Sequence, residues 1–113
     1  MAEVAEVAEM VQSGAPATIE AALKRERSTF AMKVRMARSM LAWSQTDLAK
    51  QVGMTQRAIH RIEQGHHDPM RSTVVAIERA WGAEGIEIRD DPKGGFAITF
   101  LKHFVWDRTK KKK

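Results

Sequence analysis

The segment TQRAIHRIEQG, residues 55–65, gathers hydrogen-bond donors on one side of a predicted helix. At 3.6 residues per turn, Ala58, Ile59 and Ile62 fall on one arc of this helix. The opposite arc carries two amides, two arginines and a histidine: Gln56, Arg57, His60, Arg61 and Gln64. A solvated helix face normally mixes acids with bases, but these five residues include no acid. Guanidinium and amide groups at this spacing can donate paired hydrogen bonds to the edges of nucleic-acid bases.

Two short helices joined by a tight turn are predicted to position these donors. Ser44 and Asp47 have the spacing of a capping box, which predicts a helix start. Gly53 is the predicted C-cap of that helix, and Thr55 is the predicted N-cap of the next one. So short a connection forces the helices to cross steeply, and the small side chain of Ala49 permits their close approach. This arrangement is typical of a helix-turn-helix.

The stretch from Trp43 to Gly65 resembles the lambda-repressor-like (Cro/CI, XRE-type) helix-turn-helix DNA-binding family, and Met32–Gly85 resembles it with less specificity. The matching positions lie in one gapless stretch: Gln45, Ala49, Gly53, Thr55-Gln56 and the closing IEQG at 62–65. The resemblance implies a mainly α bundle of five packed helices, the third of which lies in the major groove. It also implies an ion pair between Arg38 and Glu63 that ties the first helix to the third.

The resemblance assigns the donors to double-stranded operator DNA. The expected DNA-contacting residues are Gln45, Thr55, Gln56, Arg57, His60, Arg61 and Gln64. Gln56, Arg57 and Arg61 match base-reading positions of the family, whereas His60 and Gln64 are their neighbours. Gln45 and Thr55 stand at helix N-termini, where side chains and backbone N–H groups meet phosphate. The alternative is a solvated polar face with helix caps, which leaves the rest of the motif unexplained.

The charge is distributed in a way that fits a nucleic-acid partner. The 113 residues carry a net charge of +5. Residues 1–28 hold 3 bases and 5 acids, residues 29–85 hold 8 and 5, and residues 86–113 hold 8 and 4. The positive charge therefore falls on the predicted folded part and its tail. Many proteins without a nucleic-acid partner are equally basic, so the charge alone does not decide the function.

The sequence also indicates where the protein works. It contains no cysteine, which excludes disulfides and thiolate metal sites and suits a reducing compartment. No apolar run approaches the roughly 18 residues of a membrane span. The acidic start MAEVAEVAEM is the reverse of a basic secretory signal. We expect a cytoplasmic, nucleoid-associated protein with no membrane partner.

Four regions follow along the chain. Residues 1–28 are expected to form a leader that is partly disordered or helical; in residues 1–17 the apolar face is too thin to be buried alone. From Thr18 the apolar spacing fits either one long helix or two helices with a break at Ser28-Thr29. Residues 29–85 are the predicted helix-turn-helix domain, whose fourth helix begins after Asp68-Pro69. Residues 102–113 form a basic tail that ends in four lysines.

Residues 86–101 change from helical to alternating spacing. The turn sequence DDPKGG separates Ile86 and Ile88 from Phe96, Ile98 and Phe100, which predicts a β-hairpin. The hairpin takes the place of the fifth helix of a minimal domain of the family. Because a two-stranded hairpin is marginal alone, it must cover the helical core or pair with a second copy. It is our candidate dimerisation element, and the leader is the alternative.

No residue pattern indicates catalysis, a cofactor or a metal. His60, His66, His67 and Asp68 are close in sequence, but the loop histidines lack the i, i+4 spacing of a helical metal site. No Gly-rich phosphate loop and no nucleophile with an adjacent base is present. The sequence therefore does not predict an enzyme.

Two functions remain open. The first is a sequence-specific transcriptional regulator that binds operator DNA as a homodimer and occupies a promoter or touches polymerase. The alternative is an antitoxin or antiactivator that binds another protein through the leader or the hairpin. In that case the helix-turn-helix would serve autoregulation.

Overall fold

The computed structural model describes residues 18–101. The described part contains four helices and two strands: α2 (Ile19–Met40), α3 (Gln45–Val52), α4 (Gln56–Gln64), α5 (Arg71–Ala83), β1 (Ile86–Asp90) and β2 (Phe96–Phe100). This confirms the predicted mainly α fold with a C-terminal hairpin. Of the two arrangements open for the first segment, α2 is one continuous helix through Ser28 and Thr29. The expectations for residues 1–17 and 102–113 lie outside the described residues.

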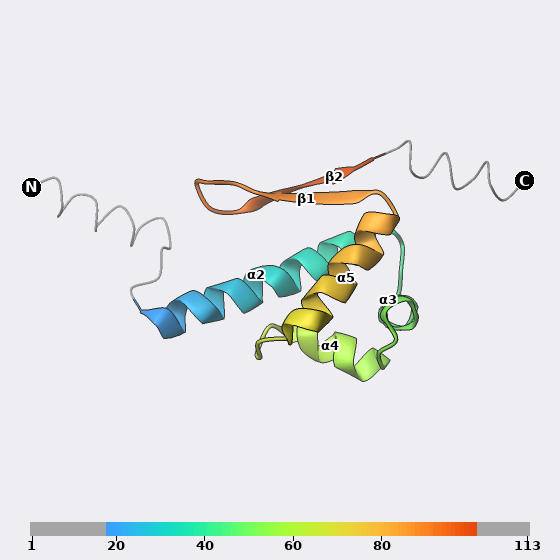
Figure 1. Cartoon of the computed structure of the whole chain (residues 1–113), viewed down its shortest axis with the longest axis horizontal. Coiled ribbons are helices and arrows are strands. Elements are labelled where there is room, and N and C mark those ends of the chain that lie inside the picture. Colours follow the sequence, from blue (N-terminus) through green and yellow to red (C-terminus); the bar gives the residue numbers. More distant parts are fainter. Residues whose placement is uncertain (1–17, 102–113) are drawn as a thin grey trace, which may run out of the picture.

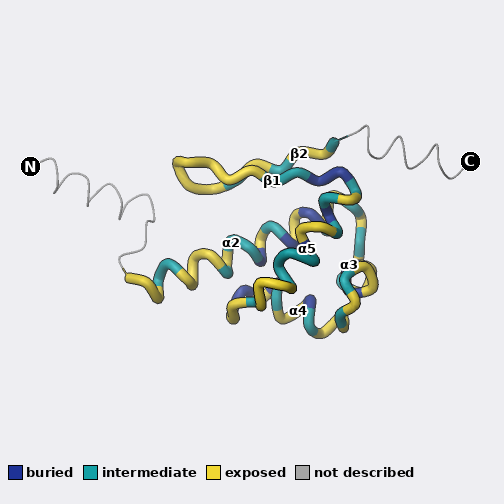
Figure 2. The backbone as a smooth tube through the Cα atoms, viewed as in Figure 1, coloured by how far each residue is buried: buried dark blue, intermediate teal, exposed yellow. Residues whose placement is uncertain are grey.

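The helices and the hairpin meet around α2. In Figure 1, the hairpin lies above α2, α4 lies below it, and α5 crosses it. Residues at steps of three on α2 (Ala31, Val34 and Ala37) are buried, which aligns one stripe of the helix with the core. The other buried apolar residues are Leu48, Ala49, Ile59, Ile77, Trp81 and Ile86. Figure 2 shows that the N-terminal part of α2 and the hairpin tip are mostly exposed, so the core lies at the other end of α2.

Local hydrogen bonds fix the two helices of the motif. The Ser44 hydroxyl accepts from the Asp47 N–H at 3.0 Å, and the Asp47 carboxylate accepts from the Ser44 N–H at 2.8 Å. The predicted capping box is therefore confirmed. The hydrogen bond from the Ser44 N–H, and after it the Ser44 side chain, hold the pKa of the Asp47 carboxyl below its usual range. Gly53 ends α3 at φ 70°, and the Thr55 hydroxyl caps α4 by accepting from Ala58 N–H at 3.1 Å.

The hairpin packs on the helical core with its inner face. Ile86 pairs with Phe100, Ile88 with Ile98 and Asp90 with Phe96, so these side chains share one side of the sheet. Ile86 is buried, and Ile88 and Ile98 pack against the helical core. The predicted apolar face of the hairpin thus covers the bundle.

Gly65 requires both a left-handed backbone and close packing. Its φ is 71°, and a Cβ added there would lie 3.3 Å from Ala31 Cβ and 3.4 Å from Ser28 Cα. Gly53 has a similar φ of 70°, but a Cβ there would meet nothing within 4 Å. We expect Gly53→Ala to lower the free energy of unfolding by about 1 kcal/mol through backbone strain. Gly65→Ala should lower it by about 2 kcal/mol, because α2 must also give way.

Urea denaturation of the two variants beside the unsubstituted protein measures this difference. Gly53→Ala is the matched control, since it carries the strain without the close approach to α2. Equal destabilisation of both variants would contradict close packing between α2 and the C-terminal end of α4.

Candidate nucleic-acid interface

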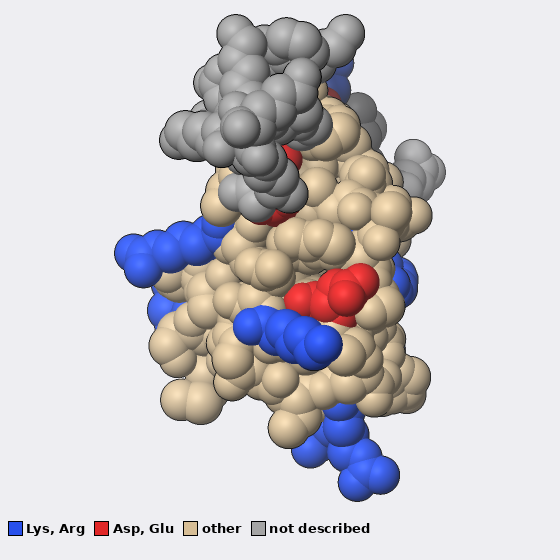
Figure 3. Space-filling view, turned by 90° about the vertical axis from the view of Figure 1, so that its right-hand side faces the viewer, with Lys and Arg blue, Asp and Glu red and all other residues tan. Residues whose placement is uncertain are grey.

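α4 buries one side and exposes the other. Ile59 is fully buried, and the Glu63 side chain is 4% exposed. The predicted donors of this helix are all exposed: Gln56, Arg57, His60, Arg61 and Gln64. Figure 3 shows Lys and Arg side chains protruding at the lower end of the molecule, where α4 lies, with no Asp or Glu visible beside them. The outer face of α4 thus offers donors without a competing acid.

A half-buried ion pair, between the partly exposed Arg38 and the buried Glu63, fixes α4 against α2. Arg38 donates to Glu63 through Nε at 2.8 Å and through Nη2 at 3.0 Å, so the pair is bidentate. The bonds to Glu63 raise the pKa of Arg38. Arg38 Nη1 also donates to the Trp43 carbonyl at 2.9 Å. One guanidinium thereby joins α2, the segment before α3, and α4.

Gln45 connects this ion pair to the exposed face. Its Nε2 donates to Glu63 Oε1 at 3.0 Å and lies 3.4 Å from His60 Nδ1. Because a carboxylate only accepts, Gln45 must turn its nitrogen to Glu63 and its oxygen outward. That oxygen accepts from Gln56 Nε2, which leaves the Gln56 carbonyl oxygen and one N–H for another partner. A buried charge therefore sets the orientation of an exposed amide.

The two arginines of α4 differ in their surroundings. Arg57 makes no hydrogen bond or ion pair with another described residue. Arg61 donates through Nε to His67 Nε2 at 3.2 Å, so its two terminal nitrogens stay available. Both guanidinium groups can therefore reach an external acceptor.

Sequence reasoning missed two contributors to this region. Arg35 of α2 donates through Nη1 to the Glu63 carbonyl near the C-terminal end of α4. Its position three residues before Arg38 was the available signal, because residues three apart share a helix face. His67, which lies in the loop after α4, supports Arg61, and no sequence pattern pointed to that interaction.

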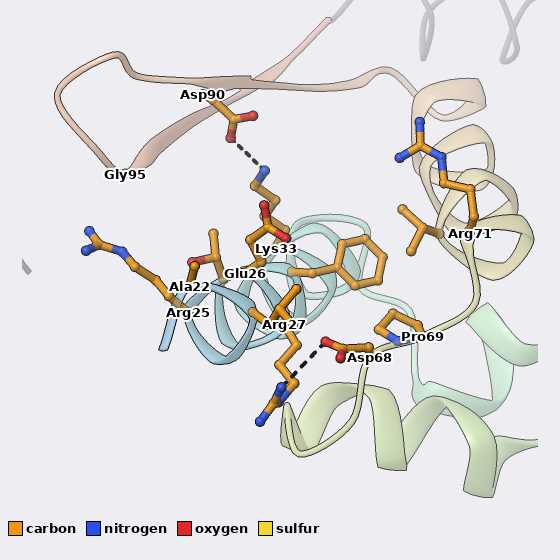
Figure 4. Close-up of a pocket in the computed structure, with 14 residues that line it drawn as sticks. Ala22, Arg25, Glu26, Arg27, Lys33, Asp68, Pro69, Arg71, Asp90 and Gly95 are labelled. Atoms are coloured by element: carbon orange, nitrogen blue, oxygen red, sulfur yellow. Dashed lines mark hydrogen bonds and ion pairs between the residues drawn. The ribbon is translucent and has the colours of Figure 1, made fainter. Parts of the chain in front are cut away.

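A pocket of about 790 Å³ lies elsewhere, between α2, the start of α5 and the hairpin tip. Figure 4 shows two ion pairs at its walls, Arg27–Asp68 at 3.6 Å and Lys33–Asp90 at 2.7 Å. None of the seven expected DNA-contacting residues lines it. Within residues 18–101, no cluster of acidic or histidine side chains could hold a metal ion, and no helix is long and apolar enough to cross a membrane.

The comparisons with known proteins agree with this geometry. A family model described as a helix-turn-helix domain matches residues 29–90, which is more than half of the chain. The matched region contains the C-terminal part of α2, the whole of α3, α4 and α5, and β1. Neither the curated proteins nor the solved structures gave a match.

Proposed function

Because the chain belongs to the helix-turn-helix domain family, we propose that it is a sequence-specific transcriptional regulator that reads the major groove with α4. The observation that carries the proposal is the acid-free donor face of α4, held in place by the Arg38–Glu63 ion pair. A helix fixed on one side and rich in donors on the other suits a B-DNA major groove. The proposal includes no catalytic step, cofactor or metal.

The residue roles follow from the hydrogen-bonding groups that each side chain still has free. Arg57 and Arg61 donate to guanine O6 and N7, and Gln56 pairs with adenine through its free oxygen and N–H. His60 and Gln64 flank these base-reading residues on the same exposed face.

The N-terminal ends of α3 and α4 are the proposed phosphate-binding groups. The Gln45 side chain is engaged within the protein, and the Thr55 hydroxyl caps α4. Gln45 and Thr55 therefore meet phosphate through the backbone N–H groups around them, which helix dipoles favour. These phosphate interactions position the protein, whereas the α4 side chains choose the sequence.

Selective binding requires two copies. One recognition helix covers only a handful of base pairs, so proteins that use this motif read two half-sites about 34 Å apart. We propose a homodimer in which residues 29–85 bind DNA and residues 86–101 join the copies. Residues 1–28 and 102–113 remain a leader and a basic tail in this division, and the protein acts on the nucleoid in the cytoplasm.

One observation favours the second candidate, an antitoxin or antiactivator that binds another protein. On the N-terminal part of α2, Ile19 is 81% exposed and Leu23 is 43% exposed. These residues belong to the leader and extend the apolar line of α2 beyond the core, so a partner could cover them. A stoichiometric protein that co-purifies with the full chain and no longer does so with Leu23→Glu would favour this function.

Selection from random DNA tests the proposed regulator. Duplexes with a random region on the order of 30 base pairs are incubated with the protein, recovered and sequenced. We expect two related half-sites about 10 base pairs apart, centre to centre. A pool recovered without any enriched sequence would refute sequence-specific reading.

The terminal lysines should add attraction that ignores sequence. Deleting Lys110–Lys113 is expected to weaken binding to specific and random duplexes by the same factor. The dependence of log K on log salt should flatten by about 0.9 for each phosphate that the shortened tail no longer neutralises. Titrations at several salt concentrations measure the slope. If the slope of log K against log salt did not change, the tail would not bind phosphate and would serve only solubility.

A further inference from the structure

β2 has an open edge with a defined set of backbone groups. The sheet has only two strands in the described part of the chain. The Leu101 N–H donates to the Gly85 carbonyl at 2.6 Å, and bonded and non-bonded pairs alternate along an antiparallel hairpin. The N–H and C=O groups of Phe96, Ile98 and Phe100 therefore point away from β1. No backbone hydrogen bond joins them to a third element within residues 18–101.

This edge lacks the features that normally prevent strand pairing. Natural edge strands carry charges, proline or bulges that discourage a second chain. The sequence of β2, FAITF, contains none of these, whereas β1 contains Glu87, Arg89 and Asp90. The β2 sequence is also symmetric in residue type about Ile98, with Phe at both ends and small residues between. Such a strand is complementary to a second copy of itself.

Apolar side chains of α2 are exposed on the same side of the molecule. α5 packs against β1, so β2 is the strand farther from α5. On α2, Phe30 faces α5, because the centre of its ring lies 6.2 Å from the centre of the Trp81 ring. At 100° per residue, three exposed methionines lie on the other side of Lys33 from Phe30. They are Met32, Met36 and Met40, which are 45%, 43% and 40% exposed.

The hairpin is held in a fixed orientation over α2. The Lys33 ammonium pairs with Asp90 at 2.7 Å and lies 5.3 Å from the centre of the Phe96 ring. Figure 4 shows Lys33 reaching from α2 to Asp90 on the hairpin. The open edge is therefore presented by an ordered element, so little order must be gained when it pairs.

We propose that two copies of this chain pair β2 against β2, antiparallel and centred on Ile98, to form one four-stranded sheet. The register places Phe96 opposite Phe100 of the second copy and Ala97 opposite Thr99 of the second copy. The outward groups of the two strands then exchange about six backbone hydrogen bonds. The methionine faces of the two α2 helices lie next to this seam.

The symmetry of the pairing places both recognition helices correctly. Directly opposed residues of an antiparallel sheet have their side chains on the same face, so both helical bundles lie on one side of the four-stranded sheet. α4 is at the end of each bundle away from the hairpin (Figure 1). Both α4 helices therefore face away from the sheet on the same side, as two half-sites on one duplex require. Only this consequence rests on the proposed function.

Cysteine cross-linking tests the register, because the chain has no cysteine of its own. Ala97→Cys and Thr99→Cys alter exposed residues on the outer face of the sheet. In the proposed register, the two sites lie about 4.5 Å apart (Cα–Cα) between copies, within disulfide range. The same position in the two copies is on the order of 8 Å apart (Cα–Cα), which is beyond that range. The mixed variants should form a linked dimer at least about tenfold faster than either variant alone.

Glu87→Cys mixed with Thr99→Cys is the control, because β1 lies one strand away from the seam. The proposal is overturned if the mixture of Ala97→Cys and Thr99→Cys forms the disulfide-linked dimer no faster than either variant alone, or no faster than this control.

Proline at the centre of the edge gives a second test. Ile98→Pro removes one outward N–H from each copy, and edge strands tolerate proline where the N–H faces outward. Ile98→Ala is the control, because it shortens the apolar side chain but keeps the N–H. Sedimentation equilibrium should give a dimer dissociation constant at least about tenfold higher for proline than for alanine. Equal constants overturn the pairing. Both tests use protein without DNA, so their failure leaves reading by α4 intact, and a failure of DNA selection leaves them unaffected.

Discussion

Replacing Arg38 by methionine is expected to lower the free energy of unfolding by about 3–5 kcal/mol. Glu63 is 4% exposed, and Arg38 supplies two of the three hydrogen bonds to its carboxylate. Methionine fills a similar volume but leaves a buried charge with only the Gln45 amide as donor. The cost is that of an unpaired buried carboxylate, which exceeds the value of the pair itself.

Two further variants separate this explanation from a general effect of removing an arginine. Arg38→Met combined with Glu63→Leu should recover most of the stability, because no charge remains to be buried. Arg89→Met removes the partner of Glu87 in a pair whose arginine side chain is 77% exposed, and should cost less than about 1 kcal/mol. Denaturant melts of all three variants measure these differences. A harmless Arg38→Met, or a double variant less stable than the single one, would contradict a stabilising role for the ion pair.

Arg61→Ala and Arg57→Ala are each expected to weaken specific DNA binding by about 1–3 kcal/mol. Both guanidinium groups are exposed on α4 and have nitrogens free for an external acceptor. If each arginine reads a guanine, its removal should relax the preference at particular base pairs and affect random duplexes much less. Competition binding with single base-pair changes across the selected site maps the affected positions.

Arg89→Ala is the matched control for both arginines, because it removes the same charge from the hairpin, at the opposite end of the molecule from α4 (Figure 1). It should alter neither the affinity for the selected site nor the base preference. If Arg61→Ala behaved in the same way as Arg89→Ala, the assignment of α4 to the groove would be wrong.

The amino-acid sequence by itself determined the local elements. In the Ser44–Asp47 capping box and the Thr55 cap, the hydrogen-bonded residues are within one helical turn of each other in the sequence. Their spacing could therefore be recognised directly. The alternation of Ile86 and Ile88 predicted strand β1 for the same reason. The division of α4 into an apolar side and a donor side likewise follows from 3.6 residues per turn. The Arg38–Glu63 pairing came from the family resemblance.

Tertiary structure alone decided how these elements act on one another. The Gln45–Glu63 bond joins residues 18 apart, and the Lys33–Asp90 bond joins residues 57 apart. Neither has a sequence signature, because local spacing carries no information about which distant surfaces will pack. The orientation of the Gln56 amide depends on the first of these bonds, and the placement of the hairpin over α2 depends on the second. Burial made the first of them specific, since a carboxylate removed from water must find its donors within the protein.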